Sequence, residues 1–261
     1  MNLEQITNQV AELAMEAGAF IREERKNFNR DLVELKGKSD LVSYVDKETE
    51  KMLVTRLSEI LPDSGFITEE KTTIQETKDY TWIIDPLDGT TNFVHDIPNY
   101  CVSIALMNNG EIVSGVVYEI ANNECFSAWS GGGTRLNSEL IKVNQDARIR
   151  DCVFATGFPI YNFEKIDDYL KILNELMKNT HGLRRMGSAA ADMAYVACGR
   201  YGGYFEYNIN AWDIAAGVIL VQEAGGTVTD FSGGNNFLFG REMISAGAVH
   251  PRLLEVVKTH W

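Results

Sequence analysis

A short apolar run followed by an acidic turn constrains this chain more than any other feature. Residues 80–85 read YTWIID, a continuous apolar stretch without helical periodicity, which is typical of a central strand buried on both faces. The sequence DPLDGTT follows at once, over residues 85–91. Because proline lacks a backbone N–H, Pro86 is expected to end the ladder pairing and to turn the chain. The pattern therefore predicts that Asp85 is fixed rigidly at the end of a buried strand.

The turn itself has the composition of a metal and phosphate site. Asp85 and Asp88 lie three residues apart, so both carboxylates and the Leu87 carbonyl can converge on one point, a hard oxygen site suited to Mg²⁺. Gly89 permits close backbone approach, and the amide of Thr90 can open a helix whose N-terminus faces an anion. A plain Asp-Pro turn with a helix cap is the alternative interpretation. The identities D, P, D, G and T occur together by chance in about one of ten thousand chains of this length, which favours a functional role.

Other acidic residues stand at the ends of predicted elements. Asp213 opens an apolar helix, Glu69 follows the apolar segment SGFIT, and Asp46 heads a helix predicted over residues 46–61. Taken singly, each has a structural interpretation, as a helix cap or, for Glu69 and Glu70, as a solvated acidic pair. Together with the turn, they match a two-metal hydrolase, in which bridging ions activate water and hold the leaving oxygen.

The charge balance argues against polyanionic partners. Among 261 residues there are 24 Lys and Arg against 37 Asp and Glu, a formal net charge of −13. Such a chain repels phosphate backbones and anionic lipid, so we expect neither a nucleic acid polymer nor a membrane surface as a partner. A phosphorylated substrate would need a cation that the chain does not encode, and a divalent metal is the usual one. The sequence lacks a signal peptide and any apolar run of the roughly 18 residues that a membrane span needs, so a cytoplasmic protein is expected.

The order of the predicted elements changes near the middle of the chain. Residues 1–145 combine two helices, the buried strand and an antiparallel meander, which predicts an α+β lobe with most of the acidic positions. Residues 146–261 alternate strands with helices, as in an α/β lobe, and include Asp213. Because no Pro- or Ser-rich linker separates them, the two lobes are expected to pack as one unit. Residues 26–40 lose their periodicity, which predicts a mobile hairpin or loop.

Five segments spread over nearly the whole chain carry motifs that belong together. They are KSDLVSYVD (38–46), FITEE (66–70), WIIDPLDGTTNFVH (82–95), MGSAAADMAYVACGRYGGYFE (186–206) and WDIAAGVILVQEAGG (212–226). In this order they resemble the inositol monophosphatase family of Mg²⁺-dependent, lithium-sensitive sugar-phosphate phosphatases. The resemblance implies a layered αβαβα sandwich of mixed α+β and α/β character, similar to the fructose-1,6-bisphosphatase fold, and usually a homodimer.

The resemblance also implies a complete set of metal ligands. Glu69, Asp85 and the Leu87 carbonyl would hold one Mg²⁺. Asp85, Asp88 and Asp213 would hold a second, so that Asp85 bridges the two ions.

Catalytic and substrate contacts follow from the same resemblance. A water at the metals, oriented by Thr90 and Asp46, would attack phosphorus in line, and Glu69 would share the proton transfer. The amides of Gly89 and Thr90 would bind phosphate oxygens, and Glu206 would bond to polyol hydroxyls. The implied substrate-binding set is Asp88, Gly89, Thr90, Gly187, Ser188, Ala189, Glu206 and Asp213.

Departures from the common family pattern leave the implied ligands intact. Thr68 stands where the family often has Gly, Ser43 replaces a common Thr, and Asp96 replaces a frequent Gly. The loop near Lys36 and Lys38 matches a mobile flap that helps to seat an additional, weaker metal, so two or three Mg²⁺ are expected for each active site. These differences bear on specificity more than on activity.

The implied activity is hydrolysis of a small polyol phosphate, with myo-inositol 1-phosphate first. The same chemistry on fructose 1,6-bisphosphate, on the 2′-phosphate of NADP or on 3′-phosphoadenosine 5′-phosphate is the alternative, and would need a wider pocket mouth near residues 157–165 and 184–189. A non-catalytic, metal-binding member of the family would lack a ligand, and none is missing here. The sequence does not identify the physiological substrate, the oligomer interface or a regulatory partner.

Overall fold

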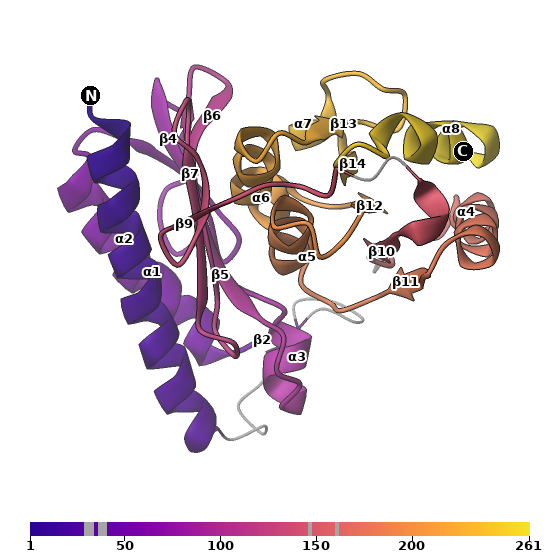
Figure 1. The fold of residues 1–261 in the computed structure, drawn as a ribbon. Coiled ribbons are helices and arrows are strands. Elements are labelled where there is room, and N and C mark those ends of the chain that lie inside the picture. The colour runs from indigo at the N-terminus through magenta and orange to yellow at the C-terminus, as the bar shows by residue number, and fades with distance from the viewer. Residues whose placement is uncertain (29–33, 36–40, 146–147, 160–161) are drawn as a thin grey trace.

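Two β-sheets form the framework of the protein (Figure 1). The computed structural model describes residues 1–28, 34–35, 41–145, 148–159 and 162–261. The first sheet has seven strands, in the order β3 (Gly65–Thr68), β4 (Tyr80–Asp88), β5 (Cys101–Asn108), β6 (Glu111–Glu119), β7 (Glu124–Trp129), β8 (Gly133–Leu136) and β9 (Glu139–Ile141). The second has five, in the order β11 (Gly182–Arg184), β10 (Val153–Thr156), β12 (Gly203–Tyr207), β14 (Glu242–Ala246) and β13 (Thr227–Thr229).

Helices cover both faces of each sheet. They are α1 (Leu3–Lys26), α2 (Tyr44–Ile60), α3 (Thr90–His95), α4 (Ile166–Asn179), α5 (Ala189–Ala197), α6 (Ala211–Glu223), α7 (Phe237–Gly240) and α8 (His250–His260), with a 3₁₀ turn η2 (Ile149–Asp151). α1 and α2 pack on one side of the seven-stranded sheet, α5 and α6 lie between the two sheets, and α4 and α8 cover the far side of the five-stranded sheet. This layering confirms the predicted αβαβα sandwich.

Three hydrophobic cores lie between the layers. Leu13 and Ile21 of α1 join Trp82 of β4 in the first core, which lies under the two N-terminal helices. The second core lies between the sheets and is formed largely by the small residues of α5 and α6. The third packs α4 and α8 on the five-stranded sheet around Tyr169 and Phe205. The middle core concerns the site most directly, because α5 and α6 are the helices whose N-termini reach the end of β4.

The start of α2 differs slightly from the prediction. The helix begins at Tyr44, two residues before the predicted start, because Ser43 is its N-cap and accepts a hydrogen bond from the Val45 amide at 3.2 Å. Asp46 occupies the third helical position and accepts a hydrogen bond from the Ser43 amide at 2.8 Å. The reciprocal arrangement is a capping box.

Strand β4 contradicts the expectation that pairing ends at Pro86. Asp85 pairs with Ser103 of β5, the register shifts, and pairing resumes where Asp88 meets Cys101. Proline removes one ladder donor, so the strand bulges at this point instead of stopping. The bulge leaves Asp85 and Asp88 on one continuous strand.

Several elements were not predicted from the sequence. Strands β8, β9 and β11 and helix α7 are short segments without clear periodicity. By contrast, β1 (Glu34–Leu35) pairs antiparallel with β2 (Leu41–Val42), which agrees with the hairpin that was one of the two alternatives predicted for residues 26–40. The proposed flap residues Lys36 and Lys38 lie outside the described residues. In the described ranges, no helix is both long and apolar enough to cross a bilayer.

Candidate active site

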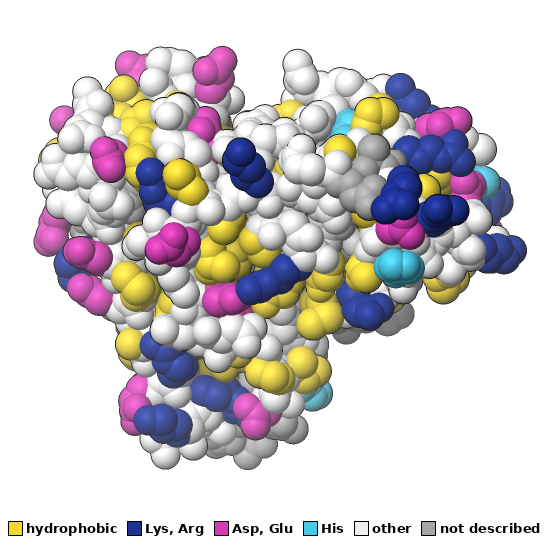
Figure 2. All heavy atoms as spheres, viewed as in Figure 1, with side chains coloured by type: hydrophobic (Ala, Val, Ile, Leu, Met, Phe, Trp, Pro, Cys, Tyr) yellow, Lys and Arg dark blue, Asp and Glu magenta, His cyan; other side chains and the backbone are white. Residues whose placement is uncertain are grey.

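A cavity of about 620 Å³ is lined by the C-terminal end of β4 and by residues at the N-termini of α5 and α6. Its lining includes every predicted site residue except Asp46, namely Glu69, Asp85, Leu87, Asp88, Gly89, Thr90, Gly187, Ser188, Ala189, Glu206 and Asp213. Acidic, basic and hydrophobic side chains are exposed between the two halves of the molecule (Figure 2). The fold thus brings together segments that are more than a hundred residues apart in the sequence, such as Glu69 and Asp213.

The bulge of β4 fixes Asp85. Its side chain is 2% exposed, and Oδ1 accepts a hydrogen bond from the Leu87 amide at 3.0 Å. The Leu87 carbonyl lies 3.1 Å from the Thr90 hydroxyl oxygen and shares its single proton with Asp46 Oδ1, which is nearer at 2.9 Å. Gly89 links these residues to α3 with φ at 97°, a left-handed conformation that glycine adopts at little cost.

Buried carboxyl groups crowd one another in this part of the cavity. Burial raises the pKa of Asp85 well above its usual value, and the neighbouring charges of Glu69, Asp88 and Asp213 raise it further. Burial also raises the pKa of Asp88 to about 6 and that of Asp213 well above its usual value. Like charges held together in a water-poor site favour protonation unless a cation compensates them.

The donor set fits a hard divalent cation. Carboxylate and carbonyl oxygens are the ligands that Mg²⁺ and Ca²⁺ take, and a bound cation would relieve the repulsion that raises these pKa values. Within the described residues, no three His, Cys, Asp or Glu groups form a preassembled metal cluster. The charges of Glu69, Asp88 and Asp213 nevertheless raise the pKa of Asp85, and a bound cation would offset these charges.

Asp88 is held by the N-terminus of α5. Its Oδ2 accepts hydrogen bonds from the Ser188 hydroxyl at 2.8 Å and from the Ala190 amide at 2.7 Å, and the Cys101 thiol donates weakly at 3.8 Å. Ser188 is 1% exposed and is also the N-cap of this helix. One oxygen of Asp88 is thus saturated by the protein, and Ser188 directs its hydroxyl at this carboxylate.

Asp46 lies beneath the cavity and contacts it through Thr90. The Thr90 hydroxyl donates to Asp46 Oδ1 at 2.9 Å, while the Ser43 hydroxyl donates to Oδ2 at 2.6 Å. Burial raises the pKa of Asp46, and the hydrogen bonds from Ser43 and Thr90 partly offset that shift. A buried carboxyl group bonded to a hydroxyl that lines the cavity is an arrangement suited to proton transfer.

Glu206 lies at another part of the lining, at the end of β12. It accepts a hydrogen bond from the Tyr204 hydroxyl. Burial raises the pKa of Glu206 to about 7, although the Tyr204 bond and the nearby Arg185 charge lower it. A Cβ atom on Gly157 would lie 2.0 Å from the carboxyl carbon of Glu206, so only glycine admits the side chain in this position.

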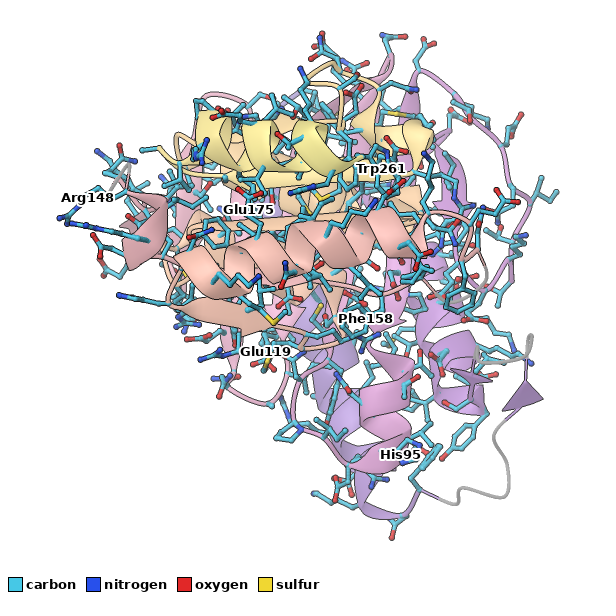
Figure 3. All side chains as sticks on the ribbon, turned by 90° about the vertical axis from the view of Figure 1, so that its right-hand side faces the viewer. His95, Glu119, Arg148, Phe158, Glu175 and Trp261 are labelled. Carbon is cyan, nitrogen blue, oxygen red and sulfur yellow. The ribbon has the colours of Figure 1, made fainter. Side chains whose placement is uncertain are left out.

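Several residues of the lining were not among the predicted site residues, and three of them bear on its chemistry. Asp192 on α5 is 2% exposed, and its buried Oδ1 has no hydrogen-bond partner. The Arg185 guanidinium stacks over the ring of Phe158, 5.7 Å from its centroid, and Phe158 is seen between α4 and α3 in Figure 3. An acid inside an alanine-rich helix was the available signal for Asp192. Phe158 and Arg185 lie within the pocket-mouth ranges named from the resemblance, residues 157–165 and 184–189, but neither was singled out there.

Comparisons with known proteins identify the family of this chain. The chain matches the Inositol monophosphatase family over residues 2–261. An inositol-1-monophosphatase of Mesorhizobium japonicum is 39% identical, with coverage of 97% of this chain and 96% of the relative. A fructose-1,6-bisphosphatase/inositol-1-monophosphatase of Thermotoga maritima is 42% identical, with coverage of 87% and 86%. A relative in Escherichia coli strain K12, named Nus factor SuhB, is 38% identical, with coverage of 96% and 93%.

A solved structure supports the fold. The extragenic suppressor protein suhB from Bartonella henselae aligns with a TM-score of 0.92 at 39% sequence identity, covering 98% of this chain and 100% of that one.

Proposed function

Because the chain belongs to the inositol monophosphatase family, a family of metal-dependent phosphatases, we propose that it hydrolyses small polyol phosphates with Mg²⁺ and acts first on myo-inositol 1-phosphate. One observation carries the proposal, the convergence of four buried or partly buried carboxyl groups on one cavity: Glu69, Asp85, Asp88 and Asp213. Such a cavity repels a phosphate ester unless cations accompany it. A metal-assisted phosphate reaction is therefore the chemistry that this cavity suits best.

Two overlapping sets of oxygen donors would hold the cations. The first comprises the carboxyl groups of Glu69 and Asp85 with the Leu87 carbonyl, and the second comprises the carboxyl groups of Asp85, Asp88 and Asp213. When bound, the cations would act as Lewis acids, offset the charge of the phosphate and lower the pKa of water. Asp85 belongs to both sets.

Asp46 and Thr90 would accept the proton of the attacking water. The Thr90 hydroxyl donates to Asp46, so its oxygen retains a lone pair for a hydrogen bond from water. As the water attacks phosphorus, its proton would pass to Thr90 while the Thr90 proton passes to Asp46. Burial raises the pKa of Asp46, which makes its carboxylate a better proton acceptor. Glu69 would share this proton transfer.

The remaining contacts would orient the substrate. The amides of Gly89 and Thr90 would donate to phosphate oxygens, and the backbone around Gly187 and Ala189 would form the adjoining wall. Glu206 would accept a hydrogen bond from a polyol hydroxyl, which favours a substrate rich in hydroxyl groups.

Phosphate release across a substrate panel tests this function. The panel holds myo-inositol 1-phosphate, fructose 1,6-bisphosphate, NADP and 3′-phosphoadenosine 5′-phosphate, each assayed with Mg²⁺ in the presence and absence of lithium. We expect preference for the inositol phosphate and loss of activity in lithium. Preference for another member would retain the mechanism and change the substrate, whereas Mg²⁺-saturated protein inert towards the whole panel would contradict the enzymatic function.

We further propose a cytoplasmic homodimer, as is usual for this family. Light scattering of the purified protein should give twice the mass of 29.2 kDa. A monomeric mass at assay concentrations would contradict this expectation.

A further inference from the structure

A fully buried carboxylate outside the cavity lining is bonded to the loop that carries Glu69. Glu50 of α2 is 0% exposed, yet it is a charged residue in an apolar region. Its two oxygens accept four hydrogen bonds, which come from Thr68 Oγ1 at 2.9 Å, the Glu70 amide at 2.7 Å, the Thr72 amide at 2.7 Å and Thr72 Oγ1 at 2.7 Å. Hydrogen bonds to an ionised acceptor are about twice as strong as neutral ones. Residues 68–72 are therefore fastened to α2 at several points.

Glu50 and Asp46 lie on the same face of α2, and each is bonded to a different part of the site. They are four residues apart on α2, so their side chains lie one above the other. Asp46 bonds to Thr90 after β4, and Glu50 bonds to the residues on either side of Glu69. The Glu69 amide itself donates to the Ile84 carbonyl of β4 at 3.2 Å. The first turns of α2 thus set the distance between these two parts of the site.

Thr68 adds a further contact to this loop. Its hydroxyl donates to Glu50 at 2.9 Å. The amide group of Gln75 donates to Thr68 Oγ1 at 3.0 Å, and the side-chain oxygen of Gln75 accepts from the Thr68 amide at 2.7 Å. The Thr68 hydroxyl therefore joins the loop before Glu69 to both Glu50 and Gln75.

We propose that Glu50 is a positioning residue that fixes the orientation of Glu69 and thereby sets the affinity of the cation site. The inference rests on the proposed function, because it assumes that Glu69 binds a metal. Glu50 does not line the cavity, so its effect passes through the backbone of residues 68–72. Groups that orient a metal ligand commonly change metal affinity by about 10- to 100-fold when they are removed.

Asp230 offers a matched control. Its carboxylate also accepts four hydrogen bonds from one loop, from the Ser232 amide and hydroxyl, the Gly234 amide and the Asn236 amide, at 2.9, 2.6, 2.7 and 3.2 Å. Asp230 is absent from the cavity lining. The variant Asp230→Asn therefore shows how the loss of such hydrogen bonds to a loop affects Mg²⁺ affinity when no proposed metal ligand depends on that loop.

The test measures Mg²⁺ binding to the whole protein by calorimetry, with wild type, Glu50→Gln and Asp230→Asn. In Glu50→Gln an N–H group must face at least one of the four donors, so the loop loses part of its anchor. We expect the Mg²⁺ dissociation constant to rise by about tenfold or more in Glu50→Gln and by less than about twofold in Asp230→Asn. At saturating Mg²⁺ the KM for inositol phosphate should match that of wild type. Equal Mg²⁺ affinity in wild type and Glu50→Gln would overturn the proposal.

Two further variants separate position from charge. Glu50→Asp keeps the charge and shortens the side chain, so it should weaken Mg²⁺ binding nearly as much as Glu50→Gln does. Wild-type affinity in Glu50→Asp would show that charge alone matters, which contradicts positioning. If Glu50→Gln does not fold, Thr72→Val, which removes one donor and leaves the charge, should weaken binding by about two- to threefold. Unchanged affinity in Thr72→Val would then overturn the proposal.

The same experiment distinguishes this inference from the proposed function. If wild type binds no Mg²⁺ and releases no phosphate, the proposed function fails. If wild type does both and the Glu50 variants bind Mg²⁺ normally, only the positioning role fails.

Discussion

The two walls of the cavity are built in different ways. The acidic wall comprises Glu69, Asp85, Asp88 and Asp213, and the substrate wall comprises Gly157, Phe158, Arg185, Asp192 and Glu206. On the acidic wall, Asp85 and Asp88 are bonded to backbone amides and are nearly inaccessible. On the substrate wall, Phe158 is 45% exposed and Asp192 has an unpartnered oxygen. The contrast indicates that hydrogen bonds hold the carboxyl groups of the acidic wall in place, whereas the side chains of the substrate wall have looser contacts.

Asp88→Asn is the strongest test of the acidic wall. The asparagine oxygen can still accept from Ser188 and Ala190, so the fold should persist while a neutral amide replaces the charged oxygen on the cavity side. We expect kcat to fall by about a thousandfold or more, because cation binding and charge stabilisation in the transition state are both lost. Phosphate release and a thermal melt measure the two effects. Near-normal turnover would contradict the role given to this wall.

Gly157→Ala tests the substrate wall alone. The added Cβ would lie 2.0 Å from the Glu206 carboxyl carbon, so this side chain must move. Since a displacement of about 1 Å can cost a hundredfold in rate, we expect kcat/KM for inositol phosphate to fall by about that factor. Mg²⁺ affinity by calorimetry should stay unchanged. A parallel loss of Mg²⁺ affinity would show that the two walls are not independent.

The charge of Glu206 gives the substrate wall its own pH dependence. The pKa of Glu206 is raised to about 7, and the charged form accepts a hydroxyl hydrogen bond more strongly. As pH falls through 7, protonation should raise the KM for inositol phosphate, by about tenfold at the acidic limit. Glu206→Gln should raise KM at high pH and flatten the profile. An unchanged KM profile in Glu206→Gln would exclude Glu206 as the titrating group.

Local patterns account for the part of the site that sequence predicted. The strand before Asp85, the turn to Thr90 and the helix near Asp213 are each contained in a short stretch of consecutive residues, so spacing and turn chemistry predicted them. Asp213 does not open its helix as predicted, because α6 begins at Ala211 with Asn210 as its N-cap and Asp213 at the third position of a capping box. The prediction that these segments converge on one cavity within an αβαβα sandwich rested on the family resemblance. No local pattern indicates how α5 and α6 pack between two sheets.

Non-local contacts account for what was missed. Gly157 meets Glu206 only because β10 pairs with β12, where Thr156 lies opposite Phe205. A glutamate in a charged helical segment is usually exposed, so the sequence did not indicate that Glu50 is buried. Its burial depends on the loop that folds over it. The continuation of β4 beyond Pro86 depends on β5, which offers a partner on the far side of the bulge. Periodicity and spacing describe one segment at a time and carry none of these pairings.

Ser188→Ala tests the contact that joins the two walls, and its effect should be the smallest. Ser188 belongs to α5, which also carries Asp192, yet its hydroxyl donates to Asp88 at 2.8 Å. Alanine removes one of two strong donors and the helix cap, so we expect about a fivefold loss of kcat and about 1 kcal/mol of stability. Ser188→Gly restores most of the capping preference without the hydroxyl, so it should recover stability and leave kcat low. If Ser188→Gly instead recovered kcat together with stability, Ser188 would act on the helix alone, and Asp88 would owe its position to the Ala190 amide and the strand beneath it.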